Sequence, residues 1–238
     1  MREFEAIWPE LEGIEGWMTE GQGRALSERA ALVPAGQAIV EIGSHHGRST
    51  IVLAFSKRPD VRLVAVDPYS DPRWGGGEDS LRVFEANLER ARVRDRVALF
   101  RGYGEEAAKG WDASPIGLLY VDGAHDYPTV RREIEAWRNR LAPGAAVLFH
   151  DTFSSPGVTR AVVSALALSP DFVYQGRSRS LAVFVHRRAS LLGRVVSIGR
   201  LGAAGPYFAR NLAIKVSLRR GWANAARALG HRGVDFPY

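Results

Sequence analysis

The segment from Ala38 to Phe55 constrains the fold of this chain more than any other part of the sequence. An apolar run ends at Gly43, and a second glycine, Gly47, precedes Ser49 and another apolar run that ends at Phe55. Such a pattern predicts a buried strand, a tight turn and the start of a helix. In doubly wound sheets, the first turn of this kind lets the backbone approach a ligand closely. We therefore expect a ligand-binding turn here.

An acidic residue follows the next apolar run. Leu63 to Val66 ends at Asp67, 24 residues after Gly43. A carboxylate at the end of a second parallel strand suits the hydroxyls of a ribose. The turn after Ile42 reads Gly-Ser-His-His-Gly-Arg, so it lacks the middle glycine that a dinucleotide pyrophosphate needs. These features predict a cofactor that contains a nucleoside, and they disfavour an NAD-dependent dehydrogenase.

Strand and helix patterns alternate along the chain. Five such βα units, followed by a predicted hairpin, indicate an α/β fold with a doubly wound parallel sheet. We expect a helical segment at residues 1–35, the sheet core at 36–187 and a helical extension at 188–238. The expected strands are 38–42, 62–66, 97–100, 116–121, 145–149, 172–175 and 181–185, the last two forming the hairpin. The expected helices are 3–33, 49–56, 79–91, 105–110, 128–140 and 157–168.

Polar side chains follow the fourth and fifth predicted strands. Asp122 and His125 come after residues 116–121, and His150 and Asp151 come after residues 145–149. Because neighbouring parallel strands end at the same edge of a sheet, we expect these four side chains in one pocket. Asp122, His150 and Asp151 are candidate ligands of Mg²⁺ or Mn²⁺. His125, His150 and Asp122 are candidate catalytic residues, because an imidazole can accept a proton near neutral pH.

The sequence E-I-G-S-x-x-G-R-S-T at residues 41–50 resembles motif I of the class I S-adenosylmethionine (SAM) methyltransferases. It is most similar to the branch with macrolide-sugar O-methyltransferases and cephalosporin-hydroxylase-like proteins, and the resemblance covers about residues 12–187. It implies a seven-stranded Rossmann-like sheet with an antiparallel last strand, an N-terminal lid at residues 1–35, and SAM as the cofactor. The implied SAM contacts are Glu41, Gly43, Ser44, Gly47, Ser49, Asp67, Gly102 and Tyr103.

The same resemblance implies a reaction. In macrolide-sugar methyltransferases a D-G-x-H-x-Y element carries a metal-binding acid and a histidine base, which here correspond to Asp122 and His125. Asp151 corresponds to a second metal ligand, and His150 stands where those enzymes have an acid. The implied activity is methyl transfer to a hydroxyl of a sugar, oligosaccharide or glycosylated metabolite. Phenolic acceptors, and a non-catalytic SAM-binding protein, remain as alternatives.

Positive charge is concentrated at the C-terminal end. Residues 188–238 contain nine Arg or Lys and one acid, whereas the rest of the chain contains 23 basic and 25 acidic residues. The pattern there predicts two amphipathic helices, divided near residues 202–206. We expect them to pack on the body or on a second subunit, with contact to an anionic membrane surface as the next alternative. Nucleic acid is disfavoured, because the core has no basic stripe.

Further features bound the environment of the protein. There is no cysteine, so no disulfide or thiolate site is expected. The N-terminus lacks a signal-peptide pattern and no run of 18 apolar residues occurs, so we expect a cytoplasmic enzyme. We also expect a homodimer. Trp17 and Trp74 are candidates for covering the cofactor and a sugar ring, respectively, although packing and an exposed loop tip explain them equally well. His45 and His46 are expected to have structural or adenosine-edge roles.

Overall fold

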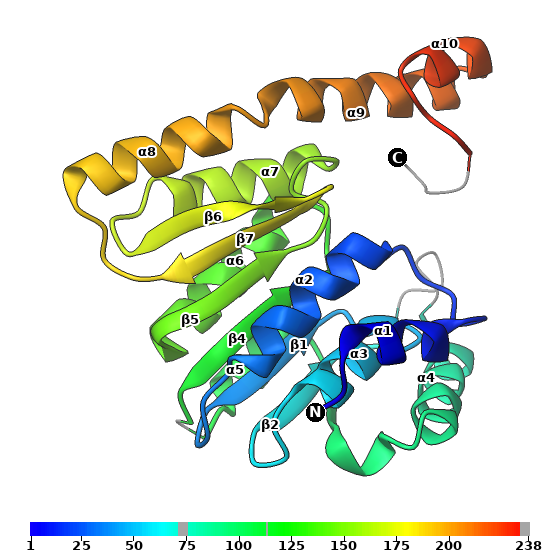
Figure 1. The fold of residues 1–238 in the computed structure, drawn as a ribbon, viewed down its shortest axis with the longest axis vertical. Coiled ribbons are helices and arrows are strands. Elements are labelled where there is room, and N and C mark those ends of the chain that lie inside the picture. The colour runs from blue at the N-terminus through cyan, green and yellow to red at the C-terminus, as the bar shows by residue number, and fades with distance from the viewer. Residues whose placement is uncertain (71–75, 113, 234–238) are drawn as a thin grey trace.

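The computed structural model describes residues 1–70, 76–112 and 114–233. Its strands are β1 Ala38–Ile42, β2 Arg62–Val66, β3 Ala98–Phe100, β4 Ile116–Val121, β5 Leu141–Phe149, β6 Phe172–Ser178 and β7 Leu181–His186. They form one seven-stranded sheet in the order β3-β2-β1-β4-β5-β7-β6, and β7 is antiparallel to both of its neighbours (Figure 1). The predicted doubly wound, Rossmann-like sheet with an antiparallel last strand is confirmed.

Two layers of helices enclose this sheet (Figure 1). One layer contains α1 Phe4–Ile7, α2 Glu20–Ala31, α3 Arg48–Ser56 and α4 Glu78–Arg90, and the other contains α5 Gly104–Lys109, α6 Tyr127–Trp137 and α7 Pro156–Val162. Alternate residues of each strand face opposite layers, so Val40 and Ile42 pack on the second layer while Ile39 packs on the first. Because both faces are covered, the central strands β1 and β4 are apolar apart from Glu41 of β1, and all six residues of β4 are buried.

The register of the sheet brings the strand ends to one level. Ile42 lies opposite both Val66 and Val121, and Val121 lies opposite Phe149. The strand order reverses direction at β1, which pairs with β2 on one side and with β4 on the other. Ligands of open α/β sheets bind at such a switch point, beyond the carboxyl ends of the strands. The residues that follow the strands at this edge are Gly43, Asp67, Asp122 and His150.

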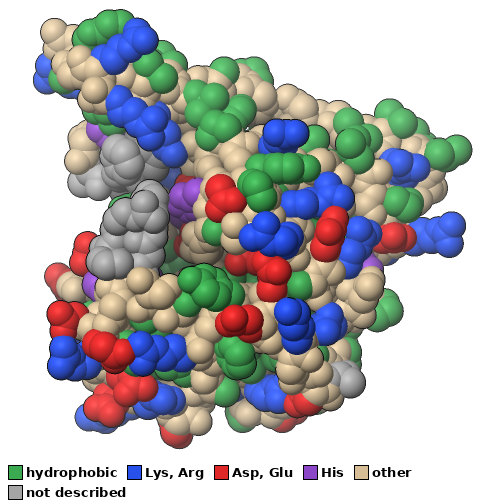
Figure 2. Space-filling model, turned by 180° about the vertical axis from the view of Figure 1, so that it is seen from behind, with side chains coloured by type: hydrophobic (Ala, Val, Ile, Leu, Met, Phe, Trp, Pro, Cys, Tyr) green, Lys and Arg blue, Asp and Glu red, His purple; other side chains and the backbone are tan. Residues whose placement is uncertain are grey.

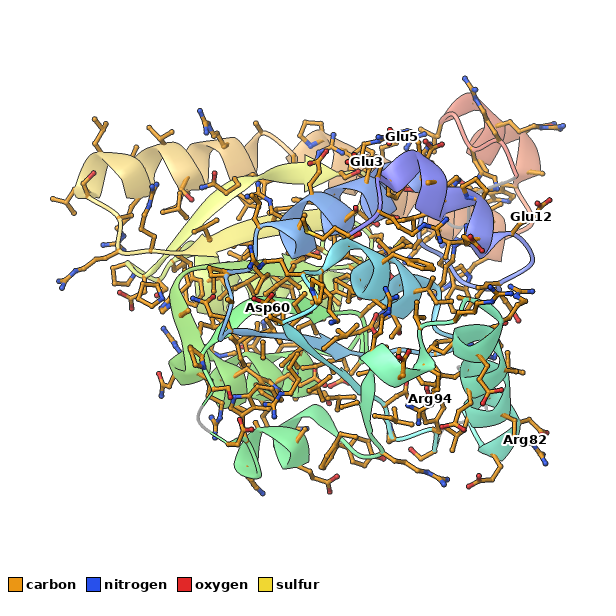
Figure 3. All side chains as sticks on the ribbon, turned by 60° about the horizontal axis from the view of Figure 1, so that its bottom comes forward. Glu3, Glu5, Glu12, Asp60, Arg82 and Arg94 are labelled. Carbon is orange, nitrogen blue, oxygen red and sulfur yellow. The ribbon has the colours of Figure 1, made fainter. Side chains whose placement is uncertain are left out.

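The N-terminal segment was expected to be helical over residues 3–33, with an interruption at Gly21 and Gly23, but the structure places both glycines inside α2 and the break earlier. The helical turns of α1 and Trp8–Leu11 are separated from α2 by a stretch in which Gly13 and Gly16 have φ angles of +75° and +155°. Helix α2 then begins after Thr19, which forms a capping box with Gln22. Figure 3 shows the acidic side chains of this segment, Glu3, Glu5 and Glu12, near the surface. Residues 12–19 therefore form a loop beside the sheet edge.

The C-terminal extension consists of α8 Leu191–Gly202, α9 Gly205–Arg219 and the short α10 Ala223–Ala228. Helix α8 lies on β6, where the Tyr174 amide donates to Ser197 Oγ at 2.8 Å. Helix α9 contacts the segment after β5, where Asn211 Nδ2 donates to the Phe153 carbonyl at 2.9 Å. Among the described residues, no helix combines the length and apolar character needed to cross a membrane.

Candidate active site

The turn between β1 and α3 requires its two predicted glycines. Gly43 has a φ of +87°, and a Cβ there would lie 2.4 Å from the Asp122 carbonyl oxygen. Gly47 has a φ of +86° and precedes α3, and its Cβ would lie 2.7 Å from a methyl of Leu88. The end of β4 and helix α4 therefore approach the turn so closely that only glycine fits without a shift. Their predicted contact with the cofactor stays a prediction.

We expect Gly43→Ala to destabilise the fold by about 2–4 kcal/mol, because the new methyl collides with the backbone at a left-handed residue. Gly36→Ala is the matched control, since Gly36 has a φ of +78° but nothing within 4 Å of its would-be Cβ. The control should therefore lose only about 1–2 kcal/mol. Urea unfolding of both variants measures the difference, and equal losses would contradict the close approach to Asp122.

Asp67, at the end of β2, holds the glycine turn in place. Its Oδ2 accepts the backbone amides of Ser44 and His45, both at 3.0 Å, and its Oδ1 accepts the amide of Tyr69 at 2.9 Å. His45 has a φ of +45°, so these hydrogen bonds stabilise a strained backbone. A carboxylate offers about four acceptor directions. Asp67 is partly exposed and so keeps capacity for the predicted ribose hydroxyls.

Glu41 and Ser49, two further predicted cofactor contacts, bind each other. Glu41 is fully buried on β1, and its two oxygens accept hydrogen bonds from Ser49 Oγ and Thr50 Oγ1 at the start of α3. Burial raises the pKa of Glu41 to about 7, while those two hydrogen bonds oppose the shift. This pair therefore ties β1 to α3 beneath the turn. Ser44 lies above it, with its hydroxyl 3.1 Å from Tyr69 Oη.

The segment after β3 forms the other side of the turn. A Cβ on Gly102 would lie 2.5 Å from the Phe100 ring, so the backbone passes close to that side chain. Tyr103 is 56% exposed, and its hydroxyl lies 3.2 Å from Ser70 Oγ. The structure thus brings Gly102 and Tyr103 to the same edge as Asp67, and their contact with adenine stays a prediction.

Glu133 is a buried acid of α6 that the sequence did not single out. Its carboxyl lies behind the segments after β3 and β4, near Gly104 and Gly123. Burial, and then the charges of Glu105 and Asp126, raise the pKa of Glu133 to about 8. Because this pKa is higher in the folded state than in the unfolded chain, its stabilising contribution is complete below about pH 4.5 and is lost as the pH rises toward 8.

The free energy of unfolding of the parent should fall between pH 5 and pH 8 as Glu133 ionises. We expect this fall to be smaller by about 2–5 kcal/mol in Glu133→Gln, because glutamine does not ionise. Glu135→Gln is the control, since Glu135 lies on the same helix but is exposed and paired with Arg131. Chemical unfolding of the variants and the parent at both pH values gives the slopes. A slope in Glu133→Gln equal to that of the parent would show that this carboxyl ionises without penalty.

The four polar residues expected after β4 and β5 do come together. Asp122 Oδ1 is 3.1 Å from His150 Nδ1, and Asp151 Oδ2 is 3.6 Å from the same nitrogen. Asp151 Oδ2 is also 3.3 Å from His125 Nε2. His150 is buried, whereas the His125 side chain is 38% exposed. The cluster therefore has an inner histidine between two carboxylates and an outer histidine at the surface.

The inner histidine is the charged centre of this cluster. Burial alone would lower the pKa of His150, but the carboxylates of Asp122 and Asp151 outweigh it and raise that pKa well above its usual value. Burial alone would raise the pKa of Asp151, but His150, His125 and a hydrogen bond from Ser154 hold it below its usual value. An imidazolium paired with carboxylates therefore lies at the inner side of the cluster.

Neighbouring segments fix the outer histidine. A Cβ on Gly157, at the start of α7, would lie 2.2 Å from the His125 carbonyl oxygen, so α7 packs directly on that loop. Ser155 Oγ donates to the same carbonyl at 3.1 Å. The loop ends at Asp126, which is the N-cap residue of α6. The Asp126 side chain accepts a hydrogen bond from the amide of Thr129 at 3.0 Å in the first turn of that helix. His125 is thus presented by packed backbone rather than by a free loop.

The structure adds residues to the cluster that sequence reasoning missed. The Tyr120 hydroxyl donates a hydrogen bond to Asp122 Oδ2 at 2.9 Å. Side chains two residues apart along a strand point to the same face, so the sequence spacing could have indicated this contact. Ser154 donates to Asp151. Lys215 of α9 donates to the Ser154 carbonyl at 2.7 Å. No sequence pattern links Lys215 with this site, because the contact joins α9 to a loop 61 residues earlier.

Three aromatic rings cover the glycine turn. The rings of His45 and His46 are stacked with centroids 3.7 Å apart, and the Trp17 ring lies 5.4 Å from that of His45. Burial, and then His46, lower the pKa of His45. Trp17 is 52% exposed, so it lies over the turn rather than in a core. Trp74, the other tryptophan named from the sequence, lies outside the described residues.

Three side chains of the cluster could hold a divalent cation. Asp122, His125 and Asp151 each place one ligand atom within 4.8 Å of the others. Carboxylate oxygens with one imidazole fit Mg²⁺, or more readily Mn²⁺. The set contains two of the three predicted ligands, with His125 in the place of His150. The positive charge of His150 beside the same carboxylates would compete with a cation.

The core of the chain matches a known family. Residues 40–152 match the model of a family described as a methyltransferase domain. Over 119 residues, 48% of the chain, the sequence is 32% identical to the uncharacterized protein y4gI of Sinorhizobium fredii, and the match spans 13% of that relative's length. The strand order and this match confirm the resemblance to class I methyltransferases.

Solved structures share the fold. The O-methyltransferase from Bacillus cereus in complex with SAH is 19% identical, with a TM-score of 0.58 over 77% of this chain and 90% of that one. TomG, an O-methyltransferase of Streptomyces achromogenes solved with SAM, is 21% identical, with a TM-score of 0.55 over 76% and 86%. CalS11, a TDP-rhamnose 3'-O-methyltransferase of calicheamicin biosynthesis, is 24% identical, with a TM-score of 0.50 over 68% and 77%.

Proposed function

Because the chain carries a methyltransferase domain at residues 40–152, we propose that it is a SAM-dependent O-methyltransferase whose acceptor is a hydroxyl of a sugar or glycosylated metabolite. The observation that carries this proposal is the convergence of Asp122, His125, His150 and Asp151 at the strand edge that also holds the glycine turn. A methyl donor bound along that turn would end beside these side chains. The polar cluster would then act on the hydroxyl that attacks the methyl group.

SAM would bind along the edge formed by β1, β2 and β3. Asp67 would accept the ribose hydroxyls, and Gly102 and Tyr103 would border the adenine. Gly43, Ser44 and Gly47 would follow the methionine portion, and the buried pair of Glu41 and Ser49 would support that turn from beneath. The structural support is the acceptor capacity left on Asp67 after its three backbone hydrogen bonds.

His125 is the proposed base. As the acceptor oxygen attacks the methyl carbon, the carbon–sulfur bond breaks with its electron pair on sulfur, and the hydroxyl proton passes to the imidazole. Asp151, 3.3 Å from Nε2, would orient the ring and stabilise its protonated form. Holding the oxygen, carbon and sulfur in line would supply further acceleration through proximity.

A divalent cation would be held by Asp122 and Asp151 together with neutral His150, as the sequence predicts. Binding to His125 instead would occupy the imidazole nitrogen that the proposed base needs. When bound, it would lower the pKa of the acceptor hydroxyl. His150 would otherwise keep the two carboxylates neutralised and in position, which makes it a positioning residue for Asp122 and Asp151. The support for the cation is the short distance between the ligand atoms of Asp122 and Asp151.

The saccharide acceptor rests on the D-G-x-H-x-Y element and on likeness in fold to CalS11. Three further proposals belong to the same account: a lid formed by residues 1–35, a separate extension formed by residues 188–238, and a homodimer. Trp17 above the glycine turn supports the first of these.

The experiment is methyl transfer from isotope-labelled SAM to a panel of sugars, nucleotide sugars and catechols, with and without EDTA. We expect label on a saccharide hydroxyl, and a rate that EDTA lowers and Mg²⁺ or Mn²⁺ restores. Label only on catechols would contradict the saccharide acceptor. A rate unchanged by EDTA would contradict the cation, and no transfer to any hydroxyl despite SAM binding would favour a non-catalytic protein.

A further inference from the structure

We propose that the C-terminal ridge, defined as the outer side of α8 and α9 together with Trp222, binds the surface of a membrane that contains anionic lipid. The ridge runs along one edge of the molecule, next to β6 and α7 (Figure 1). The proposal is independent of the proposed reaction, because it rests on the exposure and charge of helices that follow the methyltransferase domain.

Helix α8 has an apolar side that nothing in the described chain covers. Its inner side is already packed on the body, where Ser197 and Leu201 are buried. The exposed apolar side chains are Leu191 (78%), Leu192 (74%), Val195 (66%), Val196 (45%) and Ile198 (40%). Leu191 with Val195, and Leu192 with Val196, are four residues apart and so share one side of the helix. An exposed apolar row of this kind marks an interaction site.

The same outer side continues toward the end of the chain. Helix α9 buries Asn211, Ile214 and Ser217 and leaves Val216 46% exposed. Trp222 follows α9 and is 52% exposed, with the Arg220 guanidinium 5.0 Å from its ring centre. A tryptophan beside an arginine suits the headgroup region of a bilayer, where an amphipathic ring and a long charged side chain are both favourable.

The charge of this region identifies the partner as anionic. Residues 188–233 contain nine Arg or Lys and no Asp or Glu. Figure 2 shows basic and apolar side chains next to each other along the upper edge of the molecule. Helices with basic residues beside an exposed apolar row lie in the interface of anionic membranes and bury that row among the acyl chains. Each basic residue near such a surface contributes about 1 kcal/mol of attraction.

Other occupants fit this surface less well. A two-fold contact between copies of the chain would place the same basic side chains opposite each other, with no acid in either ridge to compensate them. Nucleic acid would match the charge, but it would leave the row of leucines and valines on α8 without an apolar partner. A bilayer with anionic headgroups supplies both the negative charge and the apolar phase.

Docking through the ridge would place the candidate active site beside the bilayer. Helix α9 contributes to the ridge and also donates to the carbonyls of Phe153 and Ser154, two and three residues after Asp151. Figure 2 shows histidine side chains in purple below the C-terminal helices. The enzyme would therefore work on an acceptor near the membrane surface.

The test is co-sedimentation of the full-length protein with vesicles of phosphatidylcholine alone, or of phosphatidylcholine with phosphatidylglycerol. We expect binding at least tenfold stronger to the anionic vesicles, and weaker binding as salt rises. The triple variant Leu192→Ser, Val195→Ser, Val196→Ser should lose that binding. Arg200→Gln with Arg219→Gln should weaken it by about 25-fold, or about fivefold for each charge.

Two surface variants elsewhere serve as controls. Val83→Ser and Arg82→Gln change an exposed valine and an exposed arginine on α4, and neither should alter vesicle binding. Thermal unfolding by circular dichroism confirms that each variant folds. Equal binding to both kinds of vesicle, or full binding by the triple variant, would overturn the proposal. Two other results would overturn it as well. In one, the parent is a dimer by ultracentrifugation and the triple variant is a monomer; in the other, the parent binds nucleic acid and the triple variant does not.

Discussion

Replacement of His125 by alanine is expected to lower kcat for methyl transfer by about 10²–10⁴-fold, the usual contribution of a general base. The affinity for SAM should change by less than about twofold, because His125 lies on the loop after β4, whereas most of the proposed cofactor contacts follow β1, β2 and β3. The reason for the loss is the position of the ring, which is 38% exposed and held 3.3 Å from Asp151. Single-turnover kinetics with pre-bound SAM measure the chemical step.

His186→Gln is the matched control for this variant. His186 also terminates a strand, but its ring faces the carbonyl of Ala142 on β5 at 3.1 Å and lies away from the cluster. It should retain the parent rate. A parent-like rate in His125→Ala would remove the base assignment, and an equal loss in both variants would point to a general effect on folding instead.

Asp67→Asn is expected to weaken SAM binding by about 10–100-fold, since hydrogen bonds to a charged group contribute about 1.5–3 kcal/mol each. The asparagine amide group would face one of the backbone amides that the carboxylate now accepts, so the turn at Ser44 and His45 would shift. The variant would also lose one acceptor for the ribose. Calorimetric titration with SAM gives the dissociation constant.

Asp60→Asn is the control for that measurement. Asp60 is an exposed acid on the loop before β2 and pairs with Arg58 at 3.0 Å (Figure 3). It should bind SAM as the parent does. An unchanged dissociation constant in Asp67→Asn would mean that the carboxylate neither touches the ribose nor shapes the turn around it.

The sheet could be predicted from the sequence because its strands are short apolar runs with clear ends. The run before Gly43 and the run before Asp122 are buried on both faces, so their residues are apolar apart from Glu41. The strand ends then follow from topology, and this is why Asp122 and His150 could be placed together before their contact was seen. Strand β5 begins four residues earlier than expected, because Leu141 already pairs with Ile116 of β4. The register then shifts before Leu118, which pairs with Ala146.

The electrostatic order within the cluster could not be predicted. The four residues are equivalent in sequence, each following a strand, yet His150 is buried and His125 is exposed. That difference depends on how closely α7 packs on the loop that carries His125. A Cβ on Gly157 would collide with this loop, so the close packing requires a glycine there. The role of Asp67 in bonding the glycine turn was also hidden, because backbone amides leave no mark in the sequence.

Long-range contacts account for the remaining differences. The extension was expected to be helical, but nothing in its sequence indicates that Asn211 and Lys215 donate to carbonyls next to the candidate active site. In the N-terminal segment, glycines at residues 13 and 16 allow a loop where helical structure was expected. That loop places Trp17 over the glycine turn. In both cases the decisive contact joins residues that are far apart in the chain.

The most direct test of the central claim is a crystal structure of the protein with S-adenosylhomocysteine. The account predicts the ribose hydroxyls within about 2.6–3.2 Å of Asp67, a hydrogen-bond distance, and the sulfur on the side of Asp122, His125 and Asp151. A product bound at another edge of the sheet, or with its sulfur directed away from those three side chains, would contradict it.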